Sequence, residues 1–168
     1  MMADISEIVD SGVQMEKDGI EYYSKLAESA TNPLARQMFE SFAQDEKNHV
    51  LWLEKLAAKE QVEIEEPEQV YVRLREIFQN APDELKETAK ASEDDTQALK
   101  IAIGMEVKSK EAYEKWAEEL DDPQAKALCK KLAQFEEMHR QAFVNTEEYL
   151  NRTGDWFMKE ERWMFDGG

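Results

Sequence analysis

The sequence contains only one cysteine, Cys129, among its 168 residues. An internal disulfide, a cysteine-based zinc site and an iron centre held by four thiolates all need several thiols, so this sequence provides none of them. Any metal bound here must therefore be held by oxygen and nitrogen ligands. Histidine is also scarce, with two in the chain, so the position of each one is informative.

Long apolar runs and an excess of basic residues are both missing. No segment approaches the roughly 18 apolar residues of a membrane-spanning helix, and MMADISEIVDSG has no basic region followed by an apolar run. The 38 acidic residues outnumber the 21 basic ones and give a net charge of −17, which repels nucleic acid and anionic membranes. We therefore expect a soluble, cytoplasmic protein that binds neither nucleic acid nor a membrane.

Runs of β-branched residues with period two are absent as well, and we predict an all-α protein without a sheet. Apolar residues instead recur at helical spacing over four long segments, residues 4–31, 33–60, 95–120 and 123–151. The turns TNPLA and DDPQA join these segments in pairs, because each places an N-cap residue before a proline in the first helical position. A hydrophobic fraction of 42% is enough for one core, so a single domain is expected.

The middle of the chain, residues 61–94, does not keep this period. Two prolines interrupt it, and VYVRLREIF and PDELKETAK indicate two short helices. The pattern predicts a four-helix bundle over residues 1–151, in which hairpins at 4–60 and 95–151 are joined by a long crossover connection.

The two hairpins form an internal two-fold pseudo-repeat. When the chain is shifted by 90 residues, MEKDGIEYYSKLAE (15–28) aligns with MEVKSKEAYEKWAE (105–118), and seven of the fourteen positions are identical. Pro33 meets Pro123, and AQDEKNH meets AQFEEMH, without any gap. Two copies with so long a period indicate a duplicated helical hairpin and not a solenoid.

Both histidines occur three residues after a glutamate, in EKNH and EEMH. Residues three apart lie on the same face of a helix, so each pair presents two polar groups together. Glu16 and Glu106 replace apolar residues in core-facing stripes, and at ~1.5 Å per residue Glu16 and His49 both lie ~25 Å from their turn. The sequence therefore predicts that six side chains meet inside the bundle at one level: Glu16, Glu46, His49, Glu106, Glu136 and His139.

Four carboxylates buried together need compensating charge, because burying them without a cation would cost many kcal/mol or force several to hold protons. Two divalent metal ions would balance the four charges. Each ion would take one imidazole and one terminal glutamate, and the remaining two glutamates would bridge. One Glu from each of two helices plus Glu-x-x-His from the other two is the arrangement of di-iron and di-manganese carboxylate proteins.

The motifs MEKDGIEYYSKLAE, DEKNH, MEVKSKEAY and FEEMH together resemble the rubrerythrin branch of the ferritin-like superfamily, over roughly residues 4–150. The resemblance implies a ferritin-like four-helix bundle with a di-iron site, and the same six residues match the family's metal ligands. It also implies reduction of hydrogen peroxide, or oxidation of Fe(II), in the cytoplasm of a bacterium or archaeon by a dimer or larger assembly.

Two departures from the family pattern bear on activity. Full rubrerythrins carry a rubredoxin-like domain with four cysteines, which this sequence does not contain, so a separate rubredoxin-like protein would have to donate electrons. They also carry an additional glutamate one turn after the third-helix ligand, where this chain has Ser109, mirrored by Gly19. That glutamate is linked in the family to metal movement during peroxide turnover, so its absence puts rubrerythrin-like peroxidase activity in question. Small residues at 19 and 109 would either leave room beside the metals or allow close helix packing.

Tyr23 and Tyr113 each follow an inward glutamate by seven residues, on the same helix face. They are candidates for catalysis, as hydrogen-bond donors to a ligand carboxylate or as electron carriers; the alternative is an ordinary core tyrosine.

Asp45 has no counterpart in the second hairpin, where Phe135 fills the equivalent position. It would either accept the free ring N–H of His139 and fix its tautomer, or lie exposed on the helix flank. We favour exposure.

The last residues, 152–168, concentrate large apolar side chains around a charged centre in DWFMKEERWMFDGG. Exposed, they would form a conspicuous apolar patch. We expect this tail to pack along the bundle or across a homodimer; the alternative is a docking surface for an electron-donor protein.

Our leading hypothesis is an enzyme, a di-iron oxidoreductase that reduces hydrogen peroxide or oxygen. The alternatives are a ferritin-like ferroxidase that feeds a mineral core, a dimanganese catalase, and a scaffold bundle without metal. Carboxylate and imidazole ligands suit iron or manganese, although a flexible site would also load zinc from an expression host as an artefact.

Overall fold

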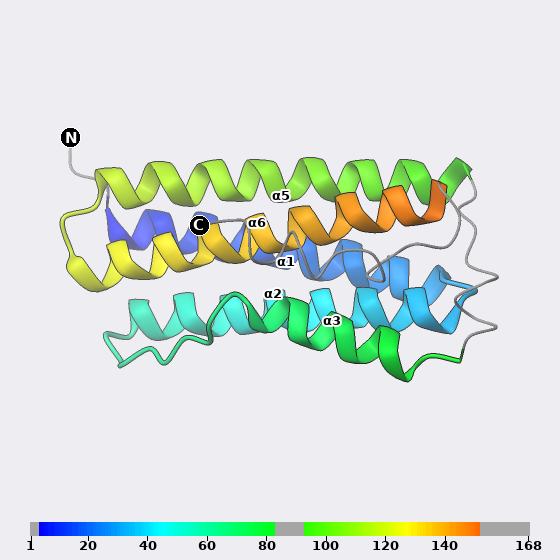
Figure 1. The fold of residues 1–168 in the computed structure, drawn as a ribbon. Helices are drawn as coiled ribbons and strands as arrows, with labels where there is room; N and C mark the ends of the chain where they lie inside the picture. Colours follow the sequence, from blue (N-terminus) through cyan, green and yellow to red (C-terminus); the bar gives the residue numbers. More distant parts are fainter. Residues whose placement is uncertain (1–3, 83–92, 152–168) are drawn as a thin grey trace.

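The computed structural model describes residues 4–82 and 93–151, and within these residues it is all-helical, without a strand. Four long helices, α1 (Ile5–Ser29), α2 (Pro33–Ala57), α5 (Glu93–Glu119) and α6 (Pro123–Asn151), run along one common direction (Figure 1). A shorter helix, α3 (Gln69–Asn80), lies against α2 and α6. The predicted all-α four-helix bundle is therefore confirmed. None of the helices described is long and apolar enough to cross a membrane.

The two turns form as the sequence predicts. Asn32 accepts a hydrogen bond from the backbone N–H of Leu34 at 2.8 Å, directly before Pro33 begins α2. Asp122 accepts one from the backbone N–H of Ala125 at 2.8 Å, directly before α6. These side-chain caps satisfy N–H groups that have no partner within the helix, and each starts the second helix of a hairpin at once.

The crossover contains the first of the two short helices predicted for it. VYVRLREIF lies within α3, which buries four apolar side chains, Val70, Tyr71, Leu74 and Phe78. The second predicted helix, PDELKETAK, falls largely on residues 83–92 and so lies outside the described residues, as does the tail 152–168. α2 ends at Ala57, three residues before its predicted end, and Lys59 follows in the left-handed region with φ 56°.

A layer of buried polar residues interrupts the hydrophobic core. Above and below it the bundle is filled by aromatic and aliphatic side chains, among them Phe42, Phe143 and Leu53, which are fully buried. Among the residues whose burial is described, those that are polar and buried, apart from Thr146, are Glu16, Asp45, Glu46, His49, Glu106, Glu136 and His139. Charged groups are rarely buried unless they are paired or bind a metal, so this layer is the candidate functional site.

Candidate metal centre

All six residues predicted to meet inside the bundle do meet there. Glu16 comes from α1, Glu106 from α5, and the two Glu-x-x-His pairs from α2 and α6. Each of the six residues is at most 2% exposed. We call this set the Glu–His cluster: Glu16, Glu46, His49, Glu106, Glu136 and His139.

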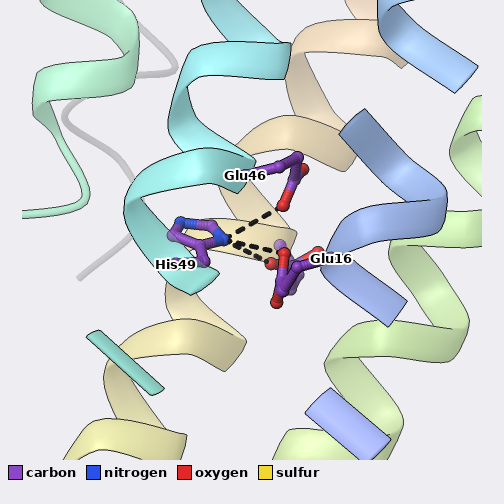
Figure 2. A group of neighbouring side chains, drawn as sticks. Glu16, Glu46 and His49 are labelled. Carbon is purple, nitrogen blue, oxygen red and sulfur yellow. Dashed lines mark hydrogen bonds and ion pairs between the residues drawn. The ribbon is translucent and has the colours of Figure 1, made fainter. Parts of the chain in front are cut away.

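One half of the cluster surrounds His49. Its Nδ1 lies 3.1 Å from a carboxylate oxygen of Glu46, 3.2 Å from one of Glu16 and 3.3 Å from one of Glu136. Figure 2 shows the contacts of the His49 ring with Glu46, from its own helix, and with Glu16, from the neighbouring helix α1. The same ring nitrogen thus faces carboxylates from three helices.

The other half surrounds His139 in the same way. Its Nδ1 lies 3.2 Å from an oxygen of Glu46 and 3.6 Å from one of Glu106. Both histidines therefore present Nδ1 to the carboxylates and leave Nε2 on the far side of the ring.

The cluster divides into two overlapping groups of four, in each of which one possible ligand atom per residue lies within 4.8 Å of the others. The His49 group is Glu16, Glu46, His49 and Glu136; the His139 group is Glu46, Glu106, Glu136 and His139. Glu46 and Glu136 belong to both groups, whereas Glu16 and Glu106 each belong to one. The sequence leaves open which glutamates bridge, and this geometry places the two from α2 and α6 between the two groups.

The crowding of carboxylates changes how the cluster titrates. Burial and the charge of Glu16 raise the pKa of Glu46 to about 8. Burial, followed by the charges of Glu46 and Glu106, raises the pKa of Glu136 well above its ordinary value. Burial would lower the pKa of His49, but the nearby carboxylates raise it well above its ordinary value. Without cations, the cluster therefore keeps several protons at neutral pH.

Four buried atoms of the cluster make no hydrogen bond within the described parts of the chain. One is His49 Nε2, on the outer side of its ring, and the three that face the centre are Glu106 Oε2, Glu136 Oε1 and His139 Nδ1. All three atoms lie within 3.6 Å of an oppositely charged group of the cluster, but without the geometry of a hydrogen bond. A buried polar atom that makes no hydrogen bond is unfavourable, and each of these three atoms is a possible metal ligand. Carboxylate oxygens and imidazole nitrogens are ligands that iron and manganese accept. The residues present therefore fit a pair of divalent ions.

The two candidate tyrosines each reach across to the opposite hairpin. Tyr23 on α1 donates a hydrogen bond to Glu106 on α5, and Tyr113 on α5 donates one to Glu16 on α1. Burial, and then the adjacent carboxylates, raise the pKa of both phenols well above the ordinary value. Both hydroxyls therefore stay protonated as donors, each to a glutamate that belongs to only one ligand group.

The interpretation of Asp45 favoured above is wrong, because Asp45 is only 3% exposed. Its Oδ2 lies 3.1 Å from Nε2 of His139, and its other oxygen accepts a hydrogen bond from Arg73 of α3. Burial would raise the pKa of Asp45, but His139 and Arg73 lower it below its ordinary value, so this carboxylate stays ionised. The helical period of α2 does not reveal this, because α3 covers the flank that would otherwise be exposed.

Arg73 is the functional-site residue that sequence reasoning missed. It lies between two buried residues of α3, Val70 and Leu74, and also bonds Glu65 at 2.9 Å. A single arginine in a short amphipathic helix gives no signal of its own. Its role follows from the packing of α3 on α2, which the sequence pattern does not specify.

Gly19 packs closely on the cluster. A Cβ added there would lie 3.4 Å from Cγ and 3.6 Å from the carboxyl carbon of Glu46, which is van der Waals contact. The Glu46 side chain therefore occupies the space beside Gly19. Ser109, at the equivalent position in the second hairpin, is half-buried.

The similarity of the chain to known proteins agrees with this geometry. A model of the rubrerythrin family matches residues 7–147, a range that contains the whole Glu–His cluster and both tyrosines. No curated protein and no solved structure matches the chain. The match covers most of the chain, and we conclude that this protein belongs to the rubrerythrin family of ferritin-like di-iron carboxylate proteins.

Proposed function

We propose that the protein is a di-iron oxidoreductase that reduces hydrogen peroxide or oxygen, with the six residues of the Glu–His cluster as the metal ligands. The observation that carries this proposal is the overlap of the two ligand groups, since Glu46 and Glu136 belong to both. Both carboxylates would be within reach of each ion, so two ions bound here would be neighbours and could together supply two electrons.

Charge balance supports two divalent ions. Four glutamates provide four negative charges, and each group adds one neutral imidazole through Nδ1. A single ion would leave two buried negative charges without compensation, and these would have to bind protons instead. Iron is the ion favoured by the family, manganese has the same ligand preference, and zinc would occupy the site as an artefact of expression.

When bound, two ferrous ions would supply two electrons, which together with two protons convert one hydrogen peroxide molecule into two water molecules. A separate donor of the rubredoxin type would then return the electrons. The chain itself orients the ligands and excludes water. Tyr23 and Tyr113 hold the single-group glutamates by hydrogen bonds. Phe42 and Phe135 each pack edge-on against one histidine ring, at 5.2 Å and 5.0 Å between ring centroids.

The first test is metal content. Protein purified without added metal, or loaded anaerobically with Fe(II), is compared with Glu46→Ala/Glu136→Ala and with a control, Glu54→Ala/Glu148→Ala, which removes exposed carboxylates from the same two helices. We expect about two equivalents of iron in the wild type and the control and none in the cluster variant. Equal absence of metal from all three proteins would contradict the proposal.

The second test is turnover. Reduced, iron-loaded protein is mixed with hydrogen peroxide, and its oxidation is followed optically with and without an electron donor. Donor-dependent peroxide consumption supports the proposal, whereas oxygen release without any donor indicates a catalase. Size-exclusion chromatography then separates the homodimer that we propose from the hollow cage that an iron-storage ferroxidase would need.

A further inference from the structure

The two histidines of the Glu–His cluster have different neighbours on their outer sides. Nε2 of His139 lies 3.1 Å from Asp45, which is held in turn by Arg73 of the crossover helix α3. Arg73 also bonds Glu65 at 2.9 Å, near the surface. The ring of His139, on α6, is thus fixed by hydrogen bonds that run through Asp45 of α2 to Arg73 of α3.

His49 has no such chain. Its Nε2 is buried and makes no hydrogen bond within residues 4–82 and 93–151. The ring packs instead against Phe135 and Trp52, with centroids 5.0 Å and 5.4 Å away. Phe135 stands at the repeat position of Asp45, 90 residues later, so an aromatic ring replaces the carboxylate in this half.

This difference bears on how well each histidine binds a cation. A histidine that binds metal through Nδ1 must carry its remaining proton on Nε2. At His139 that proton has an ionised acceptor, which fixes the tautomer and makes Nδ1 a stronger ligand. At His49 the same tautomer leaves a buried N–H without a protein acceptor, which is unfavourable.

We propose that the two metal positions fill in a fixed order, the His139 group first and the His49 group second, and that Asp45 is the positioning residue that sets this order. The proposal rests on the dinuclear centre proposed above. The two groups share Glu46 and Glu136, and their Glu–Tyr pairs are reciprocal. The residue behind the histidine is not repeated, and it is the difference that acts directly on a ligand imidazole.

Arg73, on the crossover helix α3, holds Asp45 in the orientation that it needs to bond His139. By bonding one oxygen of Asp45, it leaves the other oxygen directed at His139. Removing Arg73 would free the carboxylate to rotate without removing it, so its loss should weaken the preference less than the loss of Asp45. The fold thus links the position of α3 to the ligand strength of one histidine.

Zinc is a suitable probe because it is diamagnetic and accepts carboxylate and imidazole ligands. The chain contains only two histidines, so an imidazole ¹⁵N NMR spectrum contains two ring systems. The variant Phe135→Leu assigns the two sets of signals. It removes a ring that packs on His49 and not on His139, so the signals that shift in this variant belong to His49. In a stepwise titration of metal-free protein, we expect the His139 signals to change with the first equivalent and the His49 signals with the second.

Asp45→Asn keeps the shape of the side chain and removes its charge. We expect the first zinc affinity, measured by chelator competition, to fall about 10- to 100-fold, and the order of filling to be lost. Glu65→Gln, which changes only the outer end of the chain, is the matched control and should keep the order. Metal-free thermal melting checks that each variant is folded.

Once the two ring systems are assigned, the titration of the wild-type protein decides the main point. Parallel changes of both histidines, or His49 responding first, would overturn the inference while leaving the dinuclear centre intact. An unchanged order in folded Asp45→Asn would overturn the role of Asp45. If wild-type protein bound no zinc, the dinuclear centre itself would fail, and the inference with it.

Discussion

The α1–α2 hairpin and the α5–α6 hairpin carry the same ligand-type residues but surround them differently. The groups that face the centre are repeated, and even the tyrosine bonds are reciprocal, from Tyr23 to Glu106 and from Tyr113 to Glu16. One layer further out the repeat breaks down, because Asp45 stands behind one histidine and Phe135 behind the other. The groups that face the centre are therefore the same in the two hairpins, whereas the groups behind the histidines differ.

The repeat also separates two kinds of glutamate. Glu46 and Glu136, from the Glu-x-x-His pairs, belong to both ligand groups, and Glu16 and Glu106 belong to one each. This distinction follows from position on the helices and not from residue type. It leads to the largest effect that we expect from a single substitution.

Glu46→Gln should weaken binding of both ions so far that neither survives gel filtration, whereas Glu16→Gln should leave about one equivalent bound. The first substitution removes a charge that both ions share, and the second removes one from the His49 group alone. For Glu46→Gln we expect both affinities to fall at least 100-fold. Metal analysis after anaerobic Fe(II) loading and gel filtration measures this, and equal losses in the two variants would remove the distinction between shared and single-group glutamates.

Stability of the metal-free protein should decrease as the pH rises from about 5 to 9. Folding raises the pKa of four groups of the cluster, Glu46, Glu136, His49 and His139. Each group therefore stabilises the fold fully at a pH below its unfolded pKa, and this stabilisation is lost as the pH rises through its folded pKa. The pKa of Glu46, about 8, sets the upper part of this window. Each fully titrating group contributes about 1.4 kcal/mol per pH unit between its two pKa values.

Glu16 does not offset this trend. Burial would raise the pKa of Glu16, but His49 lowers it below the value in the unfolded chain. The contribution of Glu16 to folding stability is therefore present above the unfolded pKa and is lost only in acid. Thermal melting at several pH values checks the prediction, with the Glu46→Gln protein, whose melting temperature should vary less with pH, as the comparison. A metal-loaded sample should not show this decline, because its ligands are already deprotonated and hold no protons for rising pH to remove.

Tyr23→Phe and Tyr113→Phe should have matched and smaller effects, on opposite halves of the cluster. Each removes one hydrogen bond to a charged glutamate, worth about 1.5–3 kcal/mol, so we expect a loss of about tenfold or more in affinity for one ion. Tyr113→Phe should weaken the His49 group through Glu16, and Tyr23→Phe the His139 group through Glu106. Stepwise titration distinguishes them, and identical titration curves would mean that the hydroxyls do not act on separate groups.

The inner parts of this centre are readable from the sequence, whereas its outer parts are not. Helical period, the two capped prolines and the 90-residue repeat specify the bundle and the meeting of six residues, because each depends on spacing within one hairpin. The burial of Asp45 depends instead on how α3 packs across the bundle, which no local pattern encodes. The same limit applies to which glutamates are shared, since that depends on the relative rotation of all four helices.

The smallest effect concerns a glycine that the repeat does not reproduce. Gly12 corresponds to Ala102, yet a Cβ at Gly12 would lie 3.1 Å from Leu53 Cδ1 and 3.3 Å from the Tyr113 hydroxyl. Replacing glycine by alanine inside a helix normally stabilises it by about 0.8–1 kcal/mol. Gly104→Ala, where nothing lies within 4 Å, should show this gain, whereas Gly12→Ala should show none or a loss, and chemical denaturation measures both. An equal gain at both positions would mean that Leu53 and Tyr113 move aside without cost to accept the added methyl group.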